Sequence, residues 1–126
     1  MIRYLYNTQK SPPAPFIYVM LANPAGTKQL EQVPAQIDTG ADRTVIPWEV
    51  VLQLELVPIR EKLVESLGGE TSNLTTFLAQ LAVHRPPFRA WEVFGAKGEP
   101  YVLLGRDILN AYRILLDGPG LAVEME

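Results

Sequence analysis

The alternation of apolar and polar residues along the chain predicts a succession of short strands. Phe16–Leu21 is rich in aromatic and aliphatic residues, and Gln29–Ile37 returns as its partner strand after the turn Asn23-Pro24-Ala25-Gly26. A hairpin of this kind brings the end of the second strand to a defined place. Further strands are predicted at Ile2–Tyr6, Arg60–Ser66, Asn73–Val83, Phe88–Phe94, Tyr101–Leu104, Arg113–Asp117 and Leu121–Met125.

Two short helices are predicted between these strands. The first follows Pro47, a residue suited to the first turn of a helix, and runs from Trp48 to Leu54. The second begins at Arg106 and carries Asp107 in its first turn, where a negative charge is favourable. The apolar residues at helical spacing are Val50, Val51 and Leu54 in the first helix and Ile108, Leu109 and Tyr112 in the second.

Composition narrows the fold class. The chain has 126 residues, which is enough for one hydrophobic core but not for two, so we expect a single domain over residues 1–126. Hydrophobic residues make up 48% of it, and nine Gly and eleven Pro provide many turns, which together suit a β-rich fold. Residues 1–15 are interpreted as an N-terminal strand followed by a proline-rich spacer.

Charge and residue content exclude several classes of function. The net charge is −3 with acids and bases interleaved, so no nucleic-acid or membrane partner is expected. There is no Cys and only one His, His84, so the sequence predicts neither thiol catalysis nor a metal site, and no cofactor is expected. No signal peptide or membrane-spanning run is seen, and a cytoplasmic location is the default expectation.

The candidate catalytic residue is Asp38. Apolar residues lead up to this carboxylate, and Thr39 and Gly40 follow it at once, so the strand is expected to end on an acid held in a tight turn. Gly40 lacks the Cβ that would hinder a chain reversal or the approach of a second backbone. An Asp-Thr-Gly triplet alone can also be an ordinary turn, and its flanking sequence is needed to decide between the two interpretations.

The flanking sequence resembles the retropepsins, the retroviral-type aspartic proteases. The resemblance rests on Asp38-Thr39-Gly40-Ala41-Asp42, on the Thr44-Val45-Ile46 run that follows, on Gly68-Gly69 and on Leu103-Leu104-Gly105-Arg106-Asp107-Ile108-Leu109. These blocks occur in the family's order and span nearly the whole chain. The resemblance implies a closed, barrel-like all-β fold with one or two short helices and a glycine-tipped flap hairpin, here residues 60–83.

The resemblance also implies an aspartic endopeptidase that works as a homodimer. Peptide hydrolysis of this type needs two carboxylates that share one proton, and only Asp38 of the chain's four aspartates is followed by Thr-Gly. Two subunits would each contribute one Asp38, and the water between the two carboxylates would attack the peptide bond of a polypeptide substrate. A C-terminal hairpin over residues 113–126 would supply the sheet that joins the subunits, with Ile2–Tyr6 as a possible addition.

Roles for individual residues follow from their positions in the family's motifs. The catalytic set is Asp38, Thr39 and Gly40, with the Thr39 hydroxyls expected to cross-bond between subunits. Asp42 is expected to contact substrate main chain and to bond to Arg106, which would support the site from beneath. The predicted substrate-binding residues are Gly40, Ala41, Asp42, Gly68, Gly69 and Leu103, with Val45, Trp91 and Phe94 as further candidates for pocket lining.

Alternative interpretations are available for most of these features. Glu70 follows the Gly-Gly pair, where viral flaps carry a further glycine and apolar neighbours, and Gly-Gly is also an ordinary hairpin signal. Asp42 and Arg106 could form a purely structural ion pair. At the level of the whole protein, the alternatives are a catalytically silent dimerisation or peptide-binding module with the same fold, and an unrelated β-barrel binding protein.

Overall fold

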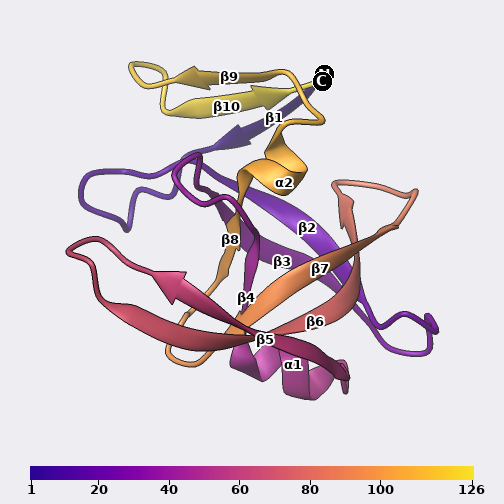
Figure 1. Cartoon of the computed structure of the whole chain (residues 1–126). Helices are drawn as coiled ribbons and strands as arrows, with labels where there is room; N and C mark the ends of the chain where they lie inside the picture. The colour runs from indigo at the N-terminus through magenta and orange to yellow at the C-terminus, as the bar shows by residue number, and fades with distance from the viewer.

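The computed structural model describes every residue from Met1 to Glu126 and consists mostly of strands, with two short helices (Figure 1). Alternating side-chain burial along the strands reflects the apolar and polar alternation of the sequence. The strands are β1 (Ile2–Leu5), β2 (Phe16–Ala22), β3 (Gln29–Ile37), β4 (Val45–Pro47), β5 (Pro58–Glu65), β6 (Thr71–Val83), β7 (Arg89–Ala96), β8 (Val102–Leu104), β9 (Ile114–Asp117) and β10 (Ala122–Met125), and the helices are α1 (Trp48–Gln53) and α2 (Arg106–Leu109).

A closed barrel forms the body of the molecule. Seven strands follow one another in the order β2-β3-β8-β4-β7-β6-β5, and β2 also pairs with β6. This additional pairing closes the six strands from β2 to β6 into a barrel and leaves β5 outside it as an edge strand. The all-β barrel with two short helices that the sequence predicted is therefore confirmed.

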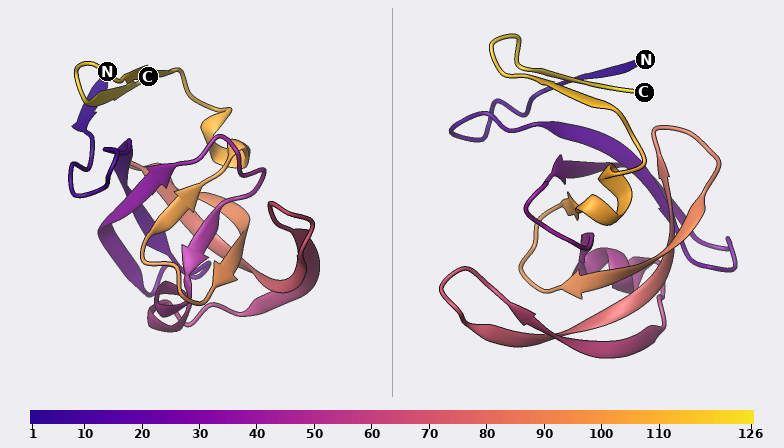
Figure 2. Two further views of the ribbon diagram at one scale, coloured as in Figure 1. Left: turned by 90° about the vertical axis from the view of Figure 1, so that its left-hand side faces the viewer. Right: turned by 45° about the horizontal axis from the view of Figure 1, so that its top comes forward.

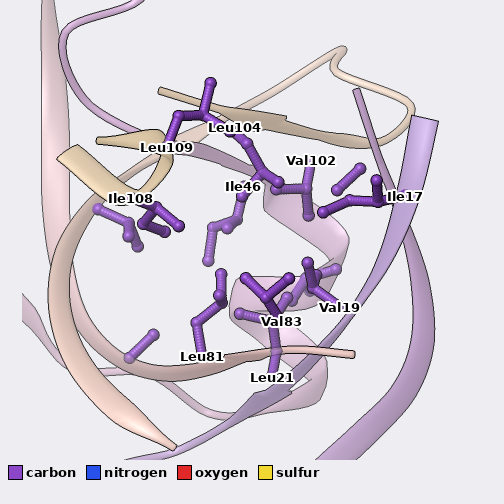
Figure 3. Close-up of a cluster of buried hydrophobic side chains, with 14 of the residues drawn as sticks. Ile17, Val19, Leu21, Ile46, Leu81, Val83, Val102, Leu104, Ile108 and Leu109 are labelled. Carbon is purple, nitrogen blue, oxygen red and sulfur yellow. The ribbon is translucent and has the colours of Figure 1, made fainter. Parts of the chain in front are cut away.

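One hydrophobic cluster of 21 buried residues fills the barrel interior and continues to both helices and to β10, and Figure 3 shows part of it. Ile17, Val19 and Leu21 alternate along β2 and point inward, and Val102 and Leu104 do the same on β8. Ile108 and Leu109 of α2 close one end of the cluster, as the helical spacing predicted. The burial of this cluster fixes the position of every strand that leads to the predicted site.

Helix α1 covers the other end of the barrel (Figure 1). It starts after Pro47, whose φ of −60° suits a helix N-terminus, and it ends at Gln53, followed by the C-cap residue Leu54, whose N–H donates to the carbonyl of Val50. Val50, Val51 and Leu54 are buried against the core. The prediction of a helix from Trp48 is thus confirmed, with its end one residue earlier.

Strands β5 and β6 form a long hairpin that extends beyond the barrel (Figures 1 and 2). Their pairing runs from Pro58 opposite Phe77 to Glu65 opposite Thr71. The hairpin projects because β6 is 13 residues long, and only its residues 80–83 pair with β2 on the barrel wall. This arrangement matches the hairpin predicted from Gly68 and Gly69.

The two ends of the chain combine in a separate three-stranded antiparallel sheet, in the order β1-β10-β9 (Figure 2). The C-terminal hairpin was predicted, and β1 joins it within the same chain, with Ile2 opposite Met125. Tyr4 links this sheet to the barrel, because its hydroxyl lies 2.8 Å from Nδ1 of His84 and its ring packs against Tyr18.

Strand β4 was not predicted. It has only three residues, Val45–Pro47, and pairs parallel to β7 and, at Val45, antiparallel to β8. So short a segment carries no measurable alternation, and its strand conformation comes from the two neighbouring strands. Neither α1 nor α2 has the length and hydropathy needed to cross a membrane.

Candidate active site

Asp38 lies at the first position after β3, in a tight turn. Its N–H donates to the carbonyl of Leu104 at 3.0 Å, and its own carbonyl accepts from the N–H of Ala41 at 3.2 Å. The first bond ties the end of β3 to β8, and the second closes the turn. The segment from Asp38 to Thr44, which we call the acid loop, therefore begins at a fixed point of the barrel.

The Asp38 carboxylate has one hydrogen-bond partner within the chain. Its Oδ1 accepts from the N–H of Gly40 at 3.1 Å. A Cβ added at Gly40 would lie 3.3 Å from that same oxygen, so a glycine leaves room for the carboxylate. The side chain is half-buried, and its remaining lone pairs are available to a second group or to water.

Arg106 holds the acid loop from beneath. Its Nη1 donates to the carbonyl of Thr39 at 2.7 Å, and its backbone N–H donates to the carbonyl of Ala41 at 2.8 Å. The expected bond between Asp42 and Arg106 is absent, and Asp42 is exposed and forms no ion pair within the chain. The guanidinium contacts backbone instead, because the turn directs the Thr39 carbonyl, not the Asp42 side chain, toward α2.

Gly105 allows α2 to approach the acid loop backbone to backbone. A Cβ at this position would lie 2.7 Å from the carbonyl carbon of Arg43, 2.9 Å from the N of Thr44 and 3.0 Å from the carbonyl oxygen of Ala41. These atoms are all backbone and cannot rotate away. A residue other than glycine would push the acid loop and α2 apart.

Hydrogen bonds between Thr44 and Asp107 attach the C-terminal end of the acid loop to α2. The N–H and the hydroxyl of Thr44 donate to the two carboxylate oxygens of Asp107, at 3.0 and 2.8 Å, and the hydroxyl accepts from the N–H of Gly105 at 3.0 Å. Thr44 is fully buried. From the sequence, Asp107 is expected only in the first turn of a helix, and no separate role is expected for Thr44, although a hydroxyl residue in an apolar run can indicate a buried hydrogen bond.

Leu103 lies next to the acid loop. On β8 it is flanked by the buried residues Val102 and Leu104, so its own half-buried side chain points to the opposite face of the sheet. It is opposite Gln36 on β3 and Val45 on β4. Ala41 is also half-buried, in the acid loop itself.

Gly68 and Gly69 form the tip of the β5–β6 hairpin. Both have positive φ values, 99° and 84°, which other residues rarely adopt. The turn is closed by bonds from Ser66 N–H to Glu70 O and from Gly69 N–H to Ser66 O. Leu67 is fully exposed at this tip, so the hairpin presents an apolar side chain to solvent next to the polar Glu70.

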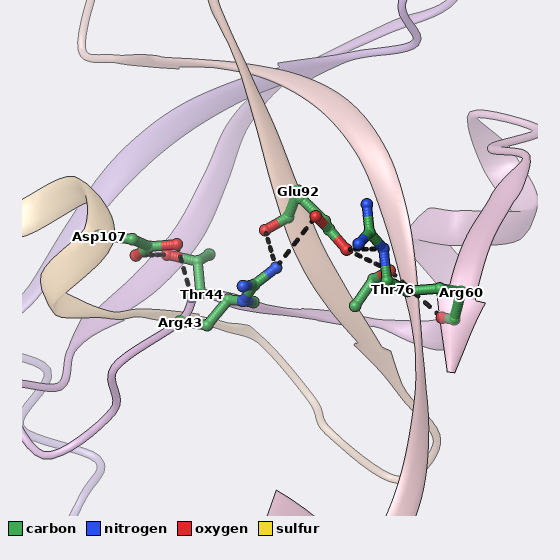
Figure 4. A network of polar contacts seen from close by, with 6 residues as sticks. All are labelled: Arg43, Thr44, Arg60, Thr76, Glu92 and Asp107. Carbon is green, nitrogen blue, oxygen red and sulfur yellow. Dashed lines mark hydrogen bonds and ion pairs between the residues drawn. The ribbon is translucent and has the colours of Figure 1, made fainter. Parts of the chain in front are cut away.

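A second polar network connects the acid loop to the hairpin (Figure 4). The carboxylate of Glu92 on β7 accepts from the Thr76 hydroxyl at 2.7 Å and pairs with Arg60 at 3.0 Å and with Arg43 at 3.4 Å. The hydrogen bond from Thr76, together with the charges of Arg60 and Arg43, lowers the pKa of Glu92 below its ordinary value against the opposing effect of burial. The sequence gave no indication of this cluster.

The predicted site residues thus fall into two groups. Asp38, Thr39, Gly40, Ala41, Asp42, Leu103 and Arg106 lie in or next to the acid loop, while Gly68 and Gly69 lie at the hairpin tip. A groove of about 660 Å³ between α1 and β5 contains none of them. No three His, Asp or Glu side chains are grouped so that they could hold a metal ion.

Comparison with known proteins identifies similar chains. A family model described as "Aspartyl protease" matches residues 24–108. The EIAV protease complexed with the inhibitor HBY-793 is 24% identical with a TM-score of 0.52, and the match covers 86% of this chain and 93% of that one. A retropepsin-like aspartic protease from Rickettsia conorii is 12% identical with a TM-score of 0.64, covering 97% of this chain and 86% of that one. No curated protein matches the sequence.

Proposed function

We propose that this chain, which belongs to the aspartyl protease family and has the retropepsin-like fold, is an endopeptidase. Its active site would combine Asp38 from each subunit of a homodimer. The position and hydrogen bonding of the Asp38 carboxylate support this proposal. The carboxylate is placed at a strand end by backbone bonds, and only one of its oxygens is engaged, by Gly40.

The reaction needs a second carboxylate beside the first. Two carboxylates about 3 Å apart cannot both ionise, so they hold one proton between them. The ionised carboxylate takes a proton from the bound water as the water oxygen attacks the scissile carbonyl carbon, and the protonated carboxylate donates to the carbonyl oxygen. As the tetrahedral intermediate collapses, the C–N bond breaks and the nitrogen takes the proton from the carboxyl group that had received it from the water, while the other carboxylate takes a proton back from a hydroxyl of the intermediate.

Two-fold symmetry would supply that second carboxylate. In a symmetric dimer each patch meets its own copy, so an Asp38 close to the axis faces the partner's Asp38. Two of the other three aspartates are engaged, since Asp107 binds Thr44 and Asp117 accepts from Gly120 N–H in the terminal hairpin. The third, Asp42, lies in the acid loop but is not followed by Thr-Gly. Arg106 holds the Thr39 carbonyl, which leaves the exposed Thr39 hydroxyl free for a bond across the axis.

The terminal sheet is proposed as a further subunit contact. Leu115 and Leu116 on β9 and Leu5 on β1 are exposed by 57%, 46% and 69%, which is unusual for leucines on a sheet. Both β1 and β9 are edge strands with unpaired backbone groups. Burial of these side chains against a second copy would stabilise the dimer that the active site requires.

Polypeptide substrates would bind as an added strand. An extended peptide between the hairpin tip and the acid loop could bond to Gly40, Asp42 and the flap glycines Gly68 and Gly69 through its main chain. Alternate side chains would then enter pockets next to Ala41 and Leu103. Leu67 at the tip could add an apolar contact when the hairpin closes over the peptide.

The test is cleavage of a mixed peptide library by the wild-type protein and by Asp38→Asn, read by mass spectrometry from acid to neutral pH. We expect the wild type to cleave and the variant to lose roughly a thousandfold or more of the activity, because both carboxylates of the pair become amides. Sedimentation should show the same dimer for both. Cleavage by Asp38→Asn would contradict the mechanism, and a folded dimer without any cleavage by the wild type would favour a silent peptide-binding module.

A further inference from the structure

One carboxylate, that of Glu92, joins three segments that are distant in the sequence. Arg43 approaches it from the acid loop at 3.4 Å, Arg60 from β5 at 3.0 Å, and the Thr76 hydroxyl from β6 at 2.7 Å (Figure 4). Arg43 also reaches the backbone carbonyl of Glu92 at 3.5 Å. Glu92 itself lies on β7, so four elements meet at this side chain.

The environment of Glu92 differs from that of an ordinary surface ion pair. Thr76 is fully buried, and the side chains of Glu92 and Arg43 are only 23% and 27% exposed. Exposed pairs contribute little to stability, but a short bond from a buried hydroxyl to an ionised carboxylate is among the stronger hydrogen bonds. The Arg43 guanidinium is further confined by the ring of Phe94, whose centroid is 5.5 Å away.

These contacts lie at the base of the β5–β6 hairpin. Arg60 and Thr76 are opposite each other in the strand register, while the turn at the tip lies between Glu65 and Thr71. A small rotation of the hairpin at its base displaces the tip more than a rotation of the same size nearer the tip does. Fixing Arg60 and Thr76 to β7 therefore sets the direction in which the hairpin extends.

The acid loop does not depend on Glu92 for the position of its catalytic end. Asp38 is bonded to Leu104 and Gly40, and Thr44 is bonded to Asp107. Glu92 reaches the loop only through Arg43. Loss of this contact should disturb the orientation of the hairpin relative to the loop more than the geometry of the carboxylate pair.

We infer that Glu92 is a positioning residue for the proposed peptide hydrolysis, in which it couples the base of the hairpin to the acid loop and so sets the hairpin for substrate binding. This inference rests on the proposed function. Because the hairpin would contact substrate and not the reacting atoms, the coupling should be visible in KM and much less in kcat.

The kinetic test compares Glu92→Gln with Glu61→Gln. The amide keeps an acceptor for Thr76 and removes the charge that holds the arginines, while Glu61 is an exposed neighbour of Arg60 and undergoes the same change of charge. We expect Glu92→Gln to raise KM about fivefold and to change kcat by less than about twofold, with no effect of Glu61→Gln. A fall in kcat at unchanged KM, or equal effects of both variants, would overturn the inference.

Hydrogen exchange tests the same coupling without any substrate. In Glu92→Gln the backbone amides of both β5 and the acid loop should exchange faster than in the wild type, and in Glu61→Gln neither should. Acceleration confined to β7 or to one of the two segments would contradict the coupling. If the wild type cleaves no peptide, the proposed function fails while the exchange result still decides whether Glu92 joins the two segments.

The dependence of hydrogen exchange on acidic pH distinguishes the charge of Glu92 from its shape. If only the shape of the side chain mattered, protonation of Glu92 would not change the exchange rates. The charged groups facing Glu92 are Arg43 from the acid loop and Arg60 and Lys62 from β5, and all remain positive in acid. Protonation of Glu92 should therefore make the exchange of the wild type approach that of Glu92→Gln measured at the same pH. Because the hydrogen bond from Thr76 and the charges of Arg60 and Arg43 lower the pKa of Glu92, the difference should shrink at a lower pH than for a glutamate without these partners. A difference that is constant down to the lowest pH at which the protein is folded would refute the coupling.

Discussion

Asp107 and Thr44 are joined by two hydrogen bonds across 63 residues of sequence: the Thr44 N–H donates to Oδ2 at 3.0 Å and its hydroxyl to Oδ1 at 2.8 Å. Through this pair, helix α2 is attached to the end of the acid loop that is furthest from Asp38. The pair therefore links the folding of the C-terminal part of the barrel to the formation of the proposed active site.

Replacing Thr44 by valine should destabilise the protein. Valine has nearly the same shape but leaves the buried N–H of Gly105 without its acceptor, and it removes one of the two hydrogen bonds that Oδ1 of Asp107 accepts, the other coming from the N–H of Ile108. We expect the free energy of unfolding to fall by about 2–3 kcal/mol, measured by urea denaturation. Thr8→Val, at an exposed position, is the control and should change it by less than about 0.5 kcal/mol. Equal stability of the two variants would show that the Asp107 contact does not support the fold.

Gly105→Ala should separate α2 from the acid loop. The added Cβ would lie within 3.0 Å of three backbone atoms, so the two segments must move. We expect a lower melting temperature and, in whatever folds, loss of peptidase activity. Gly118→Ala is the matched control, because nothing lies within 4 Å of its Cβ position. A Gly105→Ala protein with unchanged melting temperature would mean that this close approach is not required.

Arg106→Gln should lower kcat strongly and have a smaller effect on the stability of the protein. The glutamine cannot make the 2.7 Å charge-assisted bond to the Thr39 carbonyl, so the peptide that follows Asp38 is less firmly held. We expect kcat to fall about tenfold or more, because small displacements of a reacting group are costly. Arg85→Gln removes a charge at an exposed position and should leave kcat unchanged. Full activity of Arg106→Gln would remove the proposed support role.

Tyr4→Phe should change how stability depends on alkaline pH. Burial raises the pKa of Tyr4 above its ordinary value of 10.0, so the unfolded chain loses this proton first. The contribution of the neutral hydroxyl is complete below pH 10.0 and is lost as the pH rises through the higher folded pKa. Unfolding free energies of the wild type should thus decline in this range more steeply than those of Tyr4→Phe.

The control for this measurement is Tyr112→Phe, at an exposed tyrosine on the chain segment after α2. It should show the alkaline decline of the wild type. At neutral pH, Tyr4→Phe should also cost about 0.5–1.5 kcal/mol, because the bond between the Tyr4 hydroxyl and His84 is lost. Parallel curves for the wild type and Tyr4→Phe would show that the burial of Tyr4 has no effect on its titration.

Much of the architecture was predictable because it depends on local patterns. The strand Gln29–Ile37 was predicted with its exact bounds, and α1 to within one residue at its end, since alternating or helically spaced apolar residues are visible in a short window of sequence. Asp38 and its Thr-Gly neighbours were found for the same reason. Strand β4 escaped prediction because three residues carry no period and its pairing partners are far away in the sequence.

The sequence by itself determined which residue types could carry the chemistry: a lone Asp38 in an Asp-Thr-Gly turn, glycines where backbones approach closely, and apolar faces that bury themselves. Tertiary structure alone decided which polar groups meet. Arg106 binds the Thr39 carbonyl and not Asp42, and Glu92 collects two arginines from separate segments. The physical reason is that burial is encoded in local periodicity, whereas the partner of a charge depends on distances that exist only once the barrel has closed.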